Sequence, residues 1–381
     1  MQEKVSEILR RFDAVAADPQ APARAAAAAG RPVLGYFCSY VPQELYYAAG
    51  WLPVRIFGRE GDTTRADGIL QPYACSFSRS ALDAGLSGEL DHLAGVAFAH
   101  TCDTLQNVAD LWRARRPEKP VHIFSLPNRL DGPAAHRYFR AELERVRAEI
   151  EAISGPVPDG RLADVVRMHM LHQAAMRAFY ALRRAKPGCV TGTQALRLVT
   201  ASFLMDRAEH LALMTELNEA LAAMDAPPPP PLPRVLVSGS MCRDGGFVEM
   251  VESSGLLAVD DDLCVGSRSF ALPDAVDDDP LDVIIRNYLA RRPCPAFHKD
   301  GFDPGARLLE QVRASRAAGV VFLLTSFCDP MGFDYPPMRR ALDDAGVPSL
   351  AVTIEQHRPV PEQARTRLAA FAEMLAEKAT A

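Results

Sequence analysis

The sequence lacks the features that would place it in several large functional classes. No apolar run approaches the roughly 18 residues that a transmembrane helix needs. The residues after Met1 open a charged amphipathic helix and contain no apolar signal-peptide core. The net charge of -6 argues against a general nucleic-acid-binding protein and provides no basic patch for a membrane surface. We therefore expect a cytoplasmic protein that binds neither nucleic acid nor membrane.

Two kinds of local motif are also missing. No GxxxxGK[ST] phosphate loop occurs, so we do not expect the chain to hydrolyse ATP itself. No CxxC or HxxxH pair supplies the usual ligand spacing of a zinc site. The chain does have eight cysteines, and a cytoplasmic compartment disfavours a disulfide framework. Their long separations point to ligands that the fold brings together, whereas Cys189 and Cys242 are expected to be packing residues.

Short apolar strands alternate with helical patterns in both halves of the chain, as is typical of parallel sheets covered by helices. A length of 381 residues exceeds one ordinary core, and residues 227–233 (PPPPPLP) form a stiff, extended linker. We therefore predict an α/β fold with two doubly wound parallel-sheet lobes, a helical connecting layer and a cleft that holds a cofactor. The predicted parts are an N-terminal helical segment (1–30), a first α/β domain (31–155), a helical connecting region (156–226), the Pro-rich linker (227–233) and a second α/β domain (234–381).

Cys102 lies at a turn from a strand to a helix. Residues 95–98 form a short apolar strand, and a helical pattern follows over residues 105–116, with Thr104 or Asp103 able to cap its first turn. Backbone N–H groups and the helix dipole favour a thiolate at such a position, and the thiolate is the metal-binding form. In sheets of this kind, ligands sit at the carboxyl ends of the strands.

Two further cysteines repeat this arrangement. Cys328 ends the strong strand at residues 319–324, and the next helix is expected from about residue 336 to residue 345. Cys75 precedes the start of another helix. Three thiolates that converge on one cleft would make an iron–sulfur site with one iron left open, because a cubane normally takes four ligands.

Three polar residues close to cysteines are weaker candidates for catalysis. His100 stands beside Cys102 and is a candidate proton donor or ligand, although a structural histidine explains it equally well. Ser39 and Glu44 follow Cys38 and are candidates for proton transfer. The alternative is a plain loop hydroxyl and a first-turn glutamate that the helix dipole favours.

Ordered motifs run from about residue 30 to residue 375. They are GYFCSYVPQE (35–44), CSFSRS (75–80), TCD (101–103), DLCVGSR (262–268), PCP (293–295), FCDP (327–330) and QARTRLAAFAEML (363–375). Together they resemble the 2-hydroxyacyl-CoA dehydratase D-component family, which includes benzoyl-CoA reductase subunits. The chain departs from the family at residues 354–357 (IEQH), where Glu-Thr-Asp is common.

The resemblance implies a cofactor, partners and a reaction. Family members bind a 4Fe–4S cluster through three cysteines, and Cys75, Cys102 and Cys328 stand at the matching positions. A separate ATP-hydrolysing iron–sulfur activator supplies one low-potential electron. In the dehydratases this electron makes a ketyl radical anion of an acyl-CoA thioester, so that a 2-hydroxyl leaves as water; in the benzoyl-CoA reductases it reduces the aromatic ring. A dimer with a homologous chain is expected.

Two alternatives stay open. Cys38, Cys264 and Cys294 match cysteines of relatives that carry a double-cubane 8Fe–9S cluster, which would make the protein an ATP-dependent reductase of small molecules and a homodimer. The chain could instead be a non-catalytic partner subunit that shapes the dimer and binds CoA or relays electrons. Iron bound at the stoichiometry of a cluster would exclude the partner-subunit hypothesis.

Overall fold

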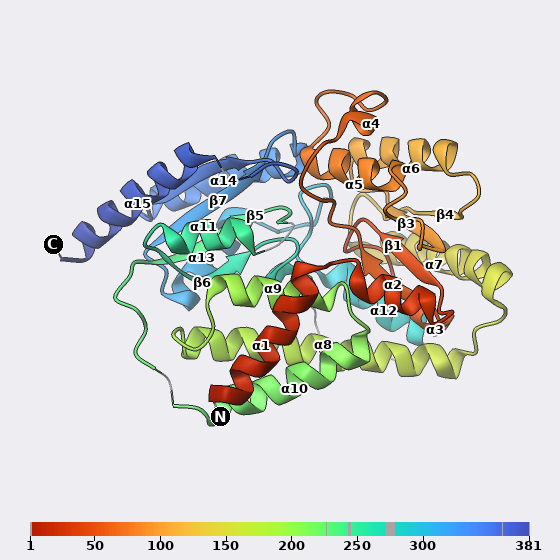
Figure 1. Ribbon diagram of the computed structural model, residues 1–381, viewed down its shortest axis with the longest axis horizontal. Coiled ribbons are helices and arrows are strands. Elements are labelled where there is room, and N and C mark those ends of the chain that lie inside the picture. The colour runs from red at the N-terminus through yellow and green to blue at the C-terminus, as the bar shows by residue number, and fades with distance from the viewer. Residues whose placement is uncertain (1, 226, 243–244, 271–278, 360, 381) are drawn as a thin grey trace.

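The computed structural model describes residues 2–225, 227–242, 245–270, 279–359 and 361–380, and it shows two α/β lobes with a group of helices beside them (Figure 1). The strands are β1 (Val33–Tyr36), β2 (Leu52–Arg55), β3 (Gly95–Ala99), β4 (Val121–Phe124), β5 (Arg234–Gly239), β6 (Leu257–Asp262), β7 (Gly319–Thr325) and β8 (Ser349–Ile354). They form two four-stranded parallel sheets, which confirms the predicted α/β class. The exact domain bounds stay predictions.

The two sheets share one topology. The strand order is β2-β1-β3-β4 in the first and β6-β5-β7-β8 in the second, so the first strand of each sheet lies between the second and the third. In open parallel sheets, ligands bind at the carboxyl ends of the strands where the order reverses. Cys38 follows β1, Cys102 follows β3 and Cys328 follows β7, so these cysteines stand at the two reversal points.

Helices cover the sheets and form the connecting layer. Helix α1 packs against α9 and α10 of that layer, and α2 packs against β1 and β2. None of the described helices is long and apolar enough to cross a membrane. The helices are α1 (Gln2–Ala17), α2 (Ala21–Ala28), α3 (Gln43–Ala48), α4 (Thr64–Asp67), α5 (Ser76–Leu86), α6 (Asp103–Arg115), α7 (Gly132–Ser154), α8 (Asp159–Ala185), α9 (Gly192–Ser202), α10 (Arg207–Ala223), α11 (Gly246–Ser253), α12 (Pro280–Ala290), α13 (Pro304–Ser315), α14 (Asp329–Asp344) and α15 (Glu362–Thr380), with the short 3₁₀ helix η1 (Ser267–Ser269).

Two helix starts differ from the prediction. Helix α14 begins at Asp329, one turn or more before the expected start near residue 336, and it contains Pro336 and Pro337 in its interior. Each proline removes one backbone donor, yet the buried residues of this helix on either side of the pair keep it continuous. Helix α6 has Cys102 itself at its N-cap, so the expected cap at Asp103 or Thr104 is wrong.

The segment of residues 280–300 belongs to the second half of the chain but lies against the first lobe. The Tyr288 hydroxyl donates to the Val41 carbonyl at 3.0 Å. The backbone N–H of Cys294 donates to the hydroxyl of Tyr40 at 3.1 Å, and helix α12 packs on α7 and α8. This segment therefore brings Cys294 to the end of the first sheet.

Three histidines are buried in the helical layer. His172 Nε2 lies 3.0 Å from His210 Nδ1, and His210 Nε2 lies 3.1 Å from the Leu198 carbonyl. Because a carbonyl only accepts, His210 carries its proton on Nε2 and accepts from His172 on Nδ1. Burial lowers the pKa of His210 to about 3 and that of His169 to about 4. Both rings are therefore neutral in the folded protein at pH 7.

Acidification is expected to destabilise the protein through these histidines. The pKa values of His169 and His210 in the folded protein lie below the unfolded value of about 6.5, so the unfolded state binds more protons. The stability that the neutral rings contribute is fully present above about pH 6.5. It is lost as the pH falls through about 4 for His169 and about 3 for His210. One differential proton corresponds to about 1.4 kcal/mol per pH unit. Urea unfolding of wild type and His169→Gln between pH 8 and 4.5 should show a shallower slope in the variant. Exposed His100→Gln serves as the control, and parallel curves for His169→Gln and wild type would contradict the prediction.

Candidate functional site

A cavity of about 430 Å³ is lined by residues from both sheets, their following loops and the 280–300 segment. Six of the eight cysteines line it. The remaining pair, Cys189 and Cys242, is not part of the lining, as expected of packing residues. The fold thus brings distant thiols into one space between the lobes. They are Cys38, Cys75, Cys102, Cys264, Cys294 and Cys328.

Three of these thiols share one local geometry. Cys75, Cys102 and Cys328 are the N-cap residues of α5, α6 and α14. All three line the cavity. Cys328 follows Phe327, whose φ of 60° is one of two positive values among the described non-glycine residues. Backbone strain of this kind is concentrated at functional sites. We call these three cysteines the helix-capping group.

Two thiols of this group, those of Cys75 and Cys102, are more protonated than the sequence suggested. Burial raises the pKa of Cys102 to about 12, which outweighs the backbone hydrogen bond from Leu105 that lowers it. Burial also raises the pKa of Cys75. Desolvation thus exceeds the effect of the helix end in the metal-free protein. Binding of a metal would then release the protons, as is usual for thiolate ligands.

The second group of thiols comes from three different loops. Cys38 follows β1, Cys264 follows β6 and Cys294 follows α12. Burial and the proximity of Cys38 and Cys264 raise the pKa of Cys294, and the proximity of Cys38 adds to the effect of burial on the pKa of Cys102 in the helix-capping group. We call Cys38, Cys264 and Cys294 the loop group. The two groups are neighbours within one cavity.

The donors that line the cavity are of the chemical type that binds iron–sulfur clusters. Within the described part of the chain, no three histidine, cysteine or carboxylate side chains are close enough to hold one metal ion. The cavity wall instead offers six soft sulfur donors spread around a volume large enough for several atoms. Thiolates are the usual ligands of iron–sulfur clusters, whose size separates their ligands.

The three polar candidates from the sequence end up in different places. Ser39 lines the cavity, and its hydroxyl accepts a hydrogen bond from Arg55 Nη1 at 2.6 Å. Glu44 is not part of the lining; its carboxylate accepts from the Tyr288 hydroxyl at 3.1 Å. His100 has an exposed side chain outside the lining. The structure therefore brings only Ser39 to the thiols.

Arginines of the cavity are the feature that the sequence analysis missed. Arg268 lies four residues after Cys264, and Arg291 and Arg292 directly precede the Pro-Cys294 pair. All three line the cavity, as does Arg55 at the end of β2. The short spacing between arginine and cysteine in two of the motifs was the available signal.

Asp262 fixes the loop that carries Cys264. The carboxylate is fully buried at the end of β6 and accepts from Arg268 Nε at 2.9 Å and Nη2 at 2.6 Å. It also accepts from the Ser238 hydroxyl at 2.9 Å and pairs with Arg292. One buried carboxylate therefore links β5, β6 and the segment before Cys294.

Gly266 has no room for a side chain in this same loop. A Cβ at this position would overlap Oδ1 of Asp261, which accepts from the Ser267 backbone N–H at 2.7 Å. We expect Gly266→Ala to cost about 1–3 kcal/mol of unfolding free energy and to lower bound iron by displacing Cys264. Chemical denaturation and iron analysis check this. Gly160→Ala has open space around its Cβ and should match wild type, so equal behaviour of the two variants would refute the prediction.

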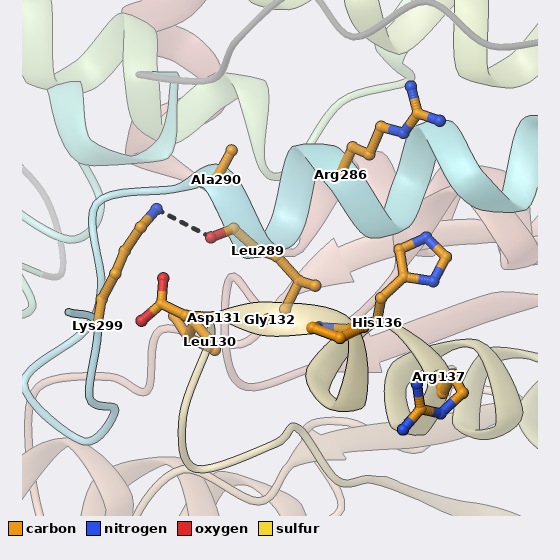
Figure 2. Close-up of a pocket in the computed structure, with 10 residues that line it drawn as sticks. Leu130, Asp131, Gly132, His136, Arg137, Arg286, Leu289, Ala290 and Lys299 are labelled. Atoms are coloured by element: carbon orange, nitrogen blue, oxygen red, sulfur yellow. Dashed lines mark hydrogen bonds between the residues drawn. The ribbon is translucent and has the colours of Figure 1, made fainter.

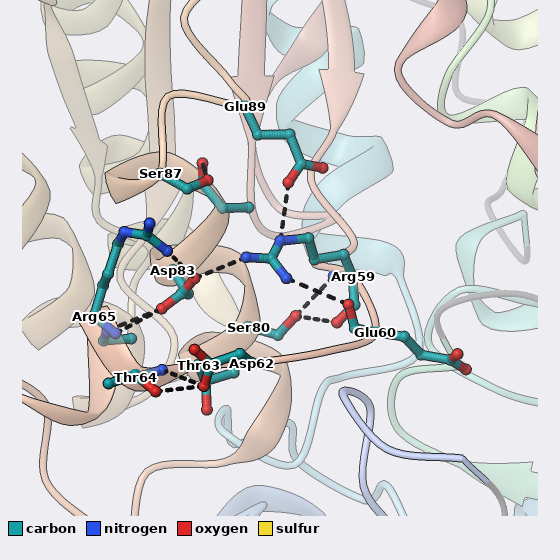
Figure 3. A network of polar contacts seen from close by, with 12 residues as sticks. Arg59, Glu60, Asp62, Thr63, Thr64, Arg65, Ser80, Asp83, Ser87 and Glu89 are labelled. Atoms are coloured by element: carbon teal, nitrogen blue, oxygen red, sulfur yellow. Dashed lines mark hydrogen bonds and ion pairs between the residues drawn. The ribbon is translucent and has the colours of Figure 1, made fainter.

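A polar network holds the loop between β2 and α4 on helix α5 (Figure 3). Asp83 of α5 is 1% exposed; it pairs with Arg59 at 2.9 Å and accepts from the backbone N–H of Arg65 at 2.9 Å. The Ser80 hydroxyl accepts from the backbone N–H of Arg59 at 2.7 Å. The loop between β2 and α4 is thereby held on the helix whose N-cap is Cys75.

The departure from the family pattern at residues 354–357 has a structural role. Gln356 is fully buried, and its side-chain amide donates to the Met241 carbonyl at 2.7 Å and the Thr325 hydroxyl at 3.1 Å. Its backbone N–H donates to the Ser76 hydroxyl at 2.9 Å, so the second lobe is tied to the residue after Cys75.

A second hollow lies between the start of α7 and the end of α12 (Figure 2). Lys299 reaches across to donate to the Leu289 carbonyl at 3.0 Å. The lining of this hollow contains no cysteine and shares no residue with the lining of the thiol cavity. This groove is therefore no part of the thiol site.

Comparison with known proteins identifies the family of the chain. The family described as "2-hydroxyglutaryl-CoA dehydratase, D-component" matches residues 38–375. The chain is 30% identical to a subunit of benzoyl-CoA reductase from Thauera aromatica, over 88% of this chain and 90% of the relative. It is 29% identical to the beta subunit of lactoyl-CoA dehydratase from Anaerotignum propionicum (98% and 100%) and 26% identical to the beta subunit of (R)-phenyllactyl-CoA dehydratase from Clostridium sporogenes (91% and 92%). The chain therefore belongs to the 2-hydroxyglutaryl-CoA dehydratase D-component family, as its motifs indicated.

Proposed function

We propose that this chain is the iron–sulfur subunit of an enzyme of the 2-hydroxyacyl-CoA dehydratase or benzoyl-CoA reductase type. The observation that carries the proposal is the cavity, in which six thiols from distant parts of the chain line one space. Plain burial would scatter cysteines through the core, as it does for Cys242. Six soft donors around one cavity are suited to iron and sulfide.

The helix-capping group would hold a 4Fe–4S cluster through Cys75, Cys102 and Cys328. Such a cluster supplies one-electron reduction at low potential when it is bound. Three N-terminal helix ends direct backbone N–H groups and positive dipole ends towards the thiolates and compensate part of their charge. Three protein ligands leave one corner of a cubane for another ligand.

Proton handling is assigned to the polar groups that the structure brings closest to the thiols. Ser39 is the best placed of the three candidates, because it lines the cavity and its hydroxyl is oriented by Arg55. Glu44 would act only through Tyr288, to which it is hydrogen-bonded. His100 stays a weaker candidate, since its side chain is exposed outside the lining.

The substrate class and the partners are inferred from the relatives. Their names refer to acyl-CoA substrates and to subunits, which supports an acyl-CoA thioester as substrate and a homologous chain as partner. The sequence has no phosphate-binding loop of its own. A separate ATP-hydrolysing iron–sulfur activator would therefore supply the electron.

The loop group favours a second candidate function. Cys38, Cys264 and Cys294 line the same cavity as the helix-capping group, and six thiols could hold a double-cubane 8Fe–9S cluster within one chain. The protein would then be an ATP-dependent reductase of small molecules, working as a homodimer. The intact thiol set speaks against a non-catalytic partner subunit in both cases.

Anaerobic assays distinguish these functions. The purified protein, its activator and ATP are incubated with lactoyl-CoA, benzoyl-CoA or a small reducible substrate such as azide. Loss of water from lactoyl-CoA or ring reduction of benzoyl-CoA supports the acyl-CoA enzyme. Turnover of azide alone supports the reductase. A protein that binds no iron would refute both.

A further inference from the structure

Four arginines line the cavity, and we call them the arginine wall: Arg55, Arg268, Arg291 and Arg292. All are buried, with Arg55 2% exposed, Arg291 7% exposed and the side chains of Arg268 and Arg292 8% and 7% exposed. No other arginine or lysine lines the cavity within the described part of the chain. Burying this much positive charge is costly unless an anion compensates it.

Part of the wall has no protein acceptor. Aromatic rings cover the guanidinium faces: Arg291 lies 3.9 Å from the centroid of Tyr288, and Arg292 lies 5.7 Å from that of Phe302. The N–H edges remain for hydrogen bonding. Among the described residues, however, Nε of Arg55, Nε of Arg291 and both Nε and Nη2 of Arg292 have no hydrogen-bond partner. Buried donors of this kind are expected to have an acceptor in the working protein.

Carboxylates compensate the wall only in part. Asp262 forms ion pairs with Arg268 and Arg292, and no other ion pair to the wall occurs among the described residues. Asp334 acts on the same two arginines at longer range, and burial raises its pKa. Arg55 bonds to the hydroxyl of Ser39 and Arg291 to its carbonyl, which are both neutral. Around these four arginines, positive charge is left in excess of the ion-paired carboxylate.

The excess charge lies beside one group of thiols. Arg268 lies four residues after Cys264, in the loop that its bond to Asp262 fixes. Arg291 and Arg292 directly precede the Pro293-Cys294 pair, and Ser39, which binds both Arg55 and Arg291, adjoins Cys38. The charged residues that line the cavity beside the helix-capping group are instead two carboxylates, Asp103 and Asp329, which directly follow Cys102 and Cys328. The two halves of the cavity therefore differ in electrostatic potential.

We propose that the arginine wall makes the part of the cavity around the loop group, Cys38, Cys264 and Cys294, the place where the bound redox group accepts an electron. The inference rests on the second candidate function above, because it needs a redox group on the loop-group thiols. Adding one electron from a low-potential donor forms and breaks no bond but adds one negative charge, which four nearby guanidiniums stabilise. The arginines act through the bound group, so they are positioning residues.

A redox titration of the anaerobically purified holoprotein tests the wall. Wild type and Arg55→Gln are titrated against dithionite and followed by EPR, with iron content measured in both. The variant should show one transition moved to a more negative potential, by about 59 mV for each tenfold loss in stabilisation of the reduced state. Arg55→Lys keeps the charge and should retain the wild-type potential. Arg183→Gln, which removes a buried arginine outside the cavity, is the matched control.

A variant that lacks one loop-group thiol, Cys264→Ser, separates this inference from the first proposed function. Cys264→Ser should remove the transition that responds to Arg55→Gln and leave the other one unmoved. If the Arg55→Gln protein binds no iron, the Arg291→Gln protein is titrated in its place. Full iron with an unshifted potential in both arginine variants would overturn the inference. An iron count of about four per chain in both wild type and Cys264→Ser would also overturn the inference. The cluster at the helix-capping group, and with it the first proposed function, would then stand.

Discussion

Replacing Cys102 with serine is expected to remove most of the bound iron and to abolish turnover. Cys102 occupies the N-cap of α6 and lines the cavity with Cys75 and Cys328, so its replacement removes one of the three proposed ligands. A serine oxygen is a hard, weakly acidic donor that does not replace a thiolate on iron. Loss of a direct ligand should exceed the roughly 10–100-fold effect that outer-shell changes have on metal affinity.

Iron and acid-labile sulfide per chain, together with the visible absorbance of the purified variant, check this expectation. Cys75→Ser and Cys328→Ser should behave in the same way. Cys189→Ser is the matched control, because Cys189 lies outside the cavity lining. A Cys102→Ser protein with the full iron content of wild type would show that the helix-capping group is not the ligand set.

Asp262→Asn is expected to cause the largest loss of stability. The substitution removes a buried negative charge and leaves Arg268 and Arg292 buried without an ion-pair partner. Breaking a buried ion pair in this way costs about 3–5 kcal/mol. Asparagine retains the shape and one acceptor oxygen, so the loss measures charge more than packing.

Urea denaturation of the metal-free protein measures this loss. The control is Asp164→Asn, which removes an exposed ion pair with Arg167 and should change the free energy of unfolding by less than about 1 kcal/mol. An Asp262→Asn protein within about 1 kcal/mol of wild type would show that the arginines are compensated by other groups.

The sheets could be predicted from the sequence because parallel strands are buried on both faces. β1, β3 and β7 are short apolar runs, and a cysteine follows each of them within a few residues. The strand-to-helix turns at Cys102 and Cys328 therefore follow from local pattern alone. The start of α14 was missed because Pro336 and Pro337 imitate a first turn, although they lie inside the helix.

The remaining part of the site depends on contacts between residues far apart in the sequence. Helix α12 was not predicted, and its return to the first lobe rests on Tyr288 and on the segment that follows it. Nothing in the local pattern around Cys294 shows that this loop adjoins Ser39. The arginine wall is likewise assembled from β2, the β6 loop and the end of α12, so its excess of charge appears only in three dimensions.

The most direct test of the account is to purify the protein without oxygen and to count iron and acid-labile sulfide per chain, with an EPR spectrum after reduction. The account predicts both elements in near-equal amounts, with roughly four irons for one cubane at the helix-capping group and roughly eight when the loop group contributes ligands. In both cases the number of irons per chain must fall when Cys102 is replaced with serine. A folded protein that contains no iron, or iron without sulfide, would contradict the central claim that this cavity binds an iron–sulfur cluster.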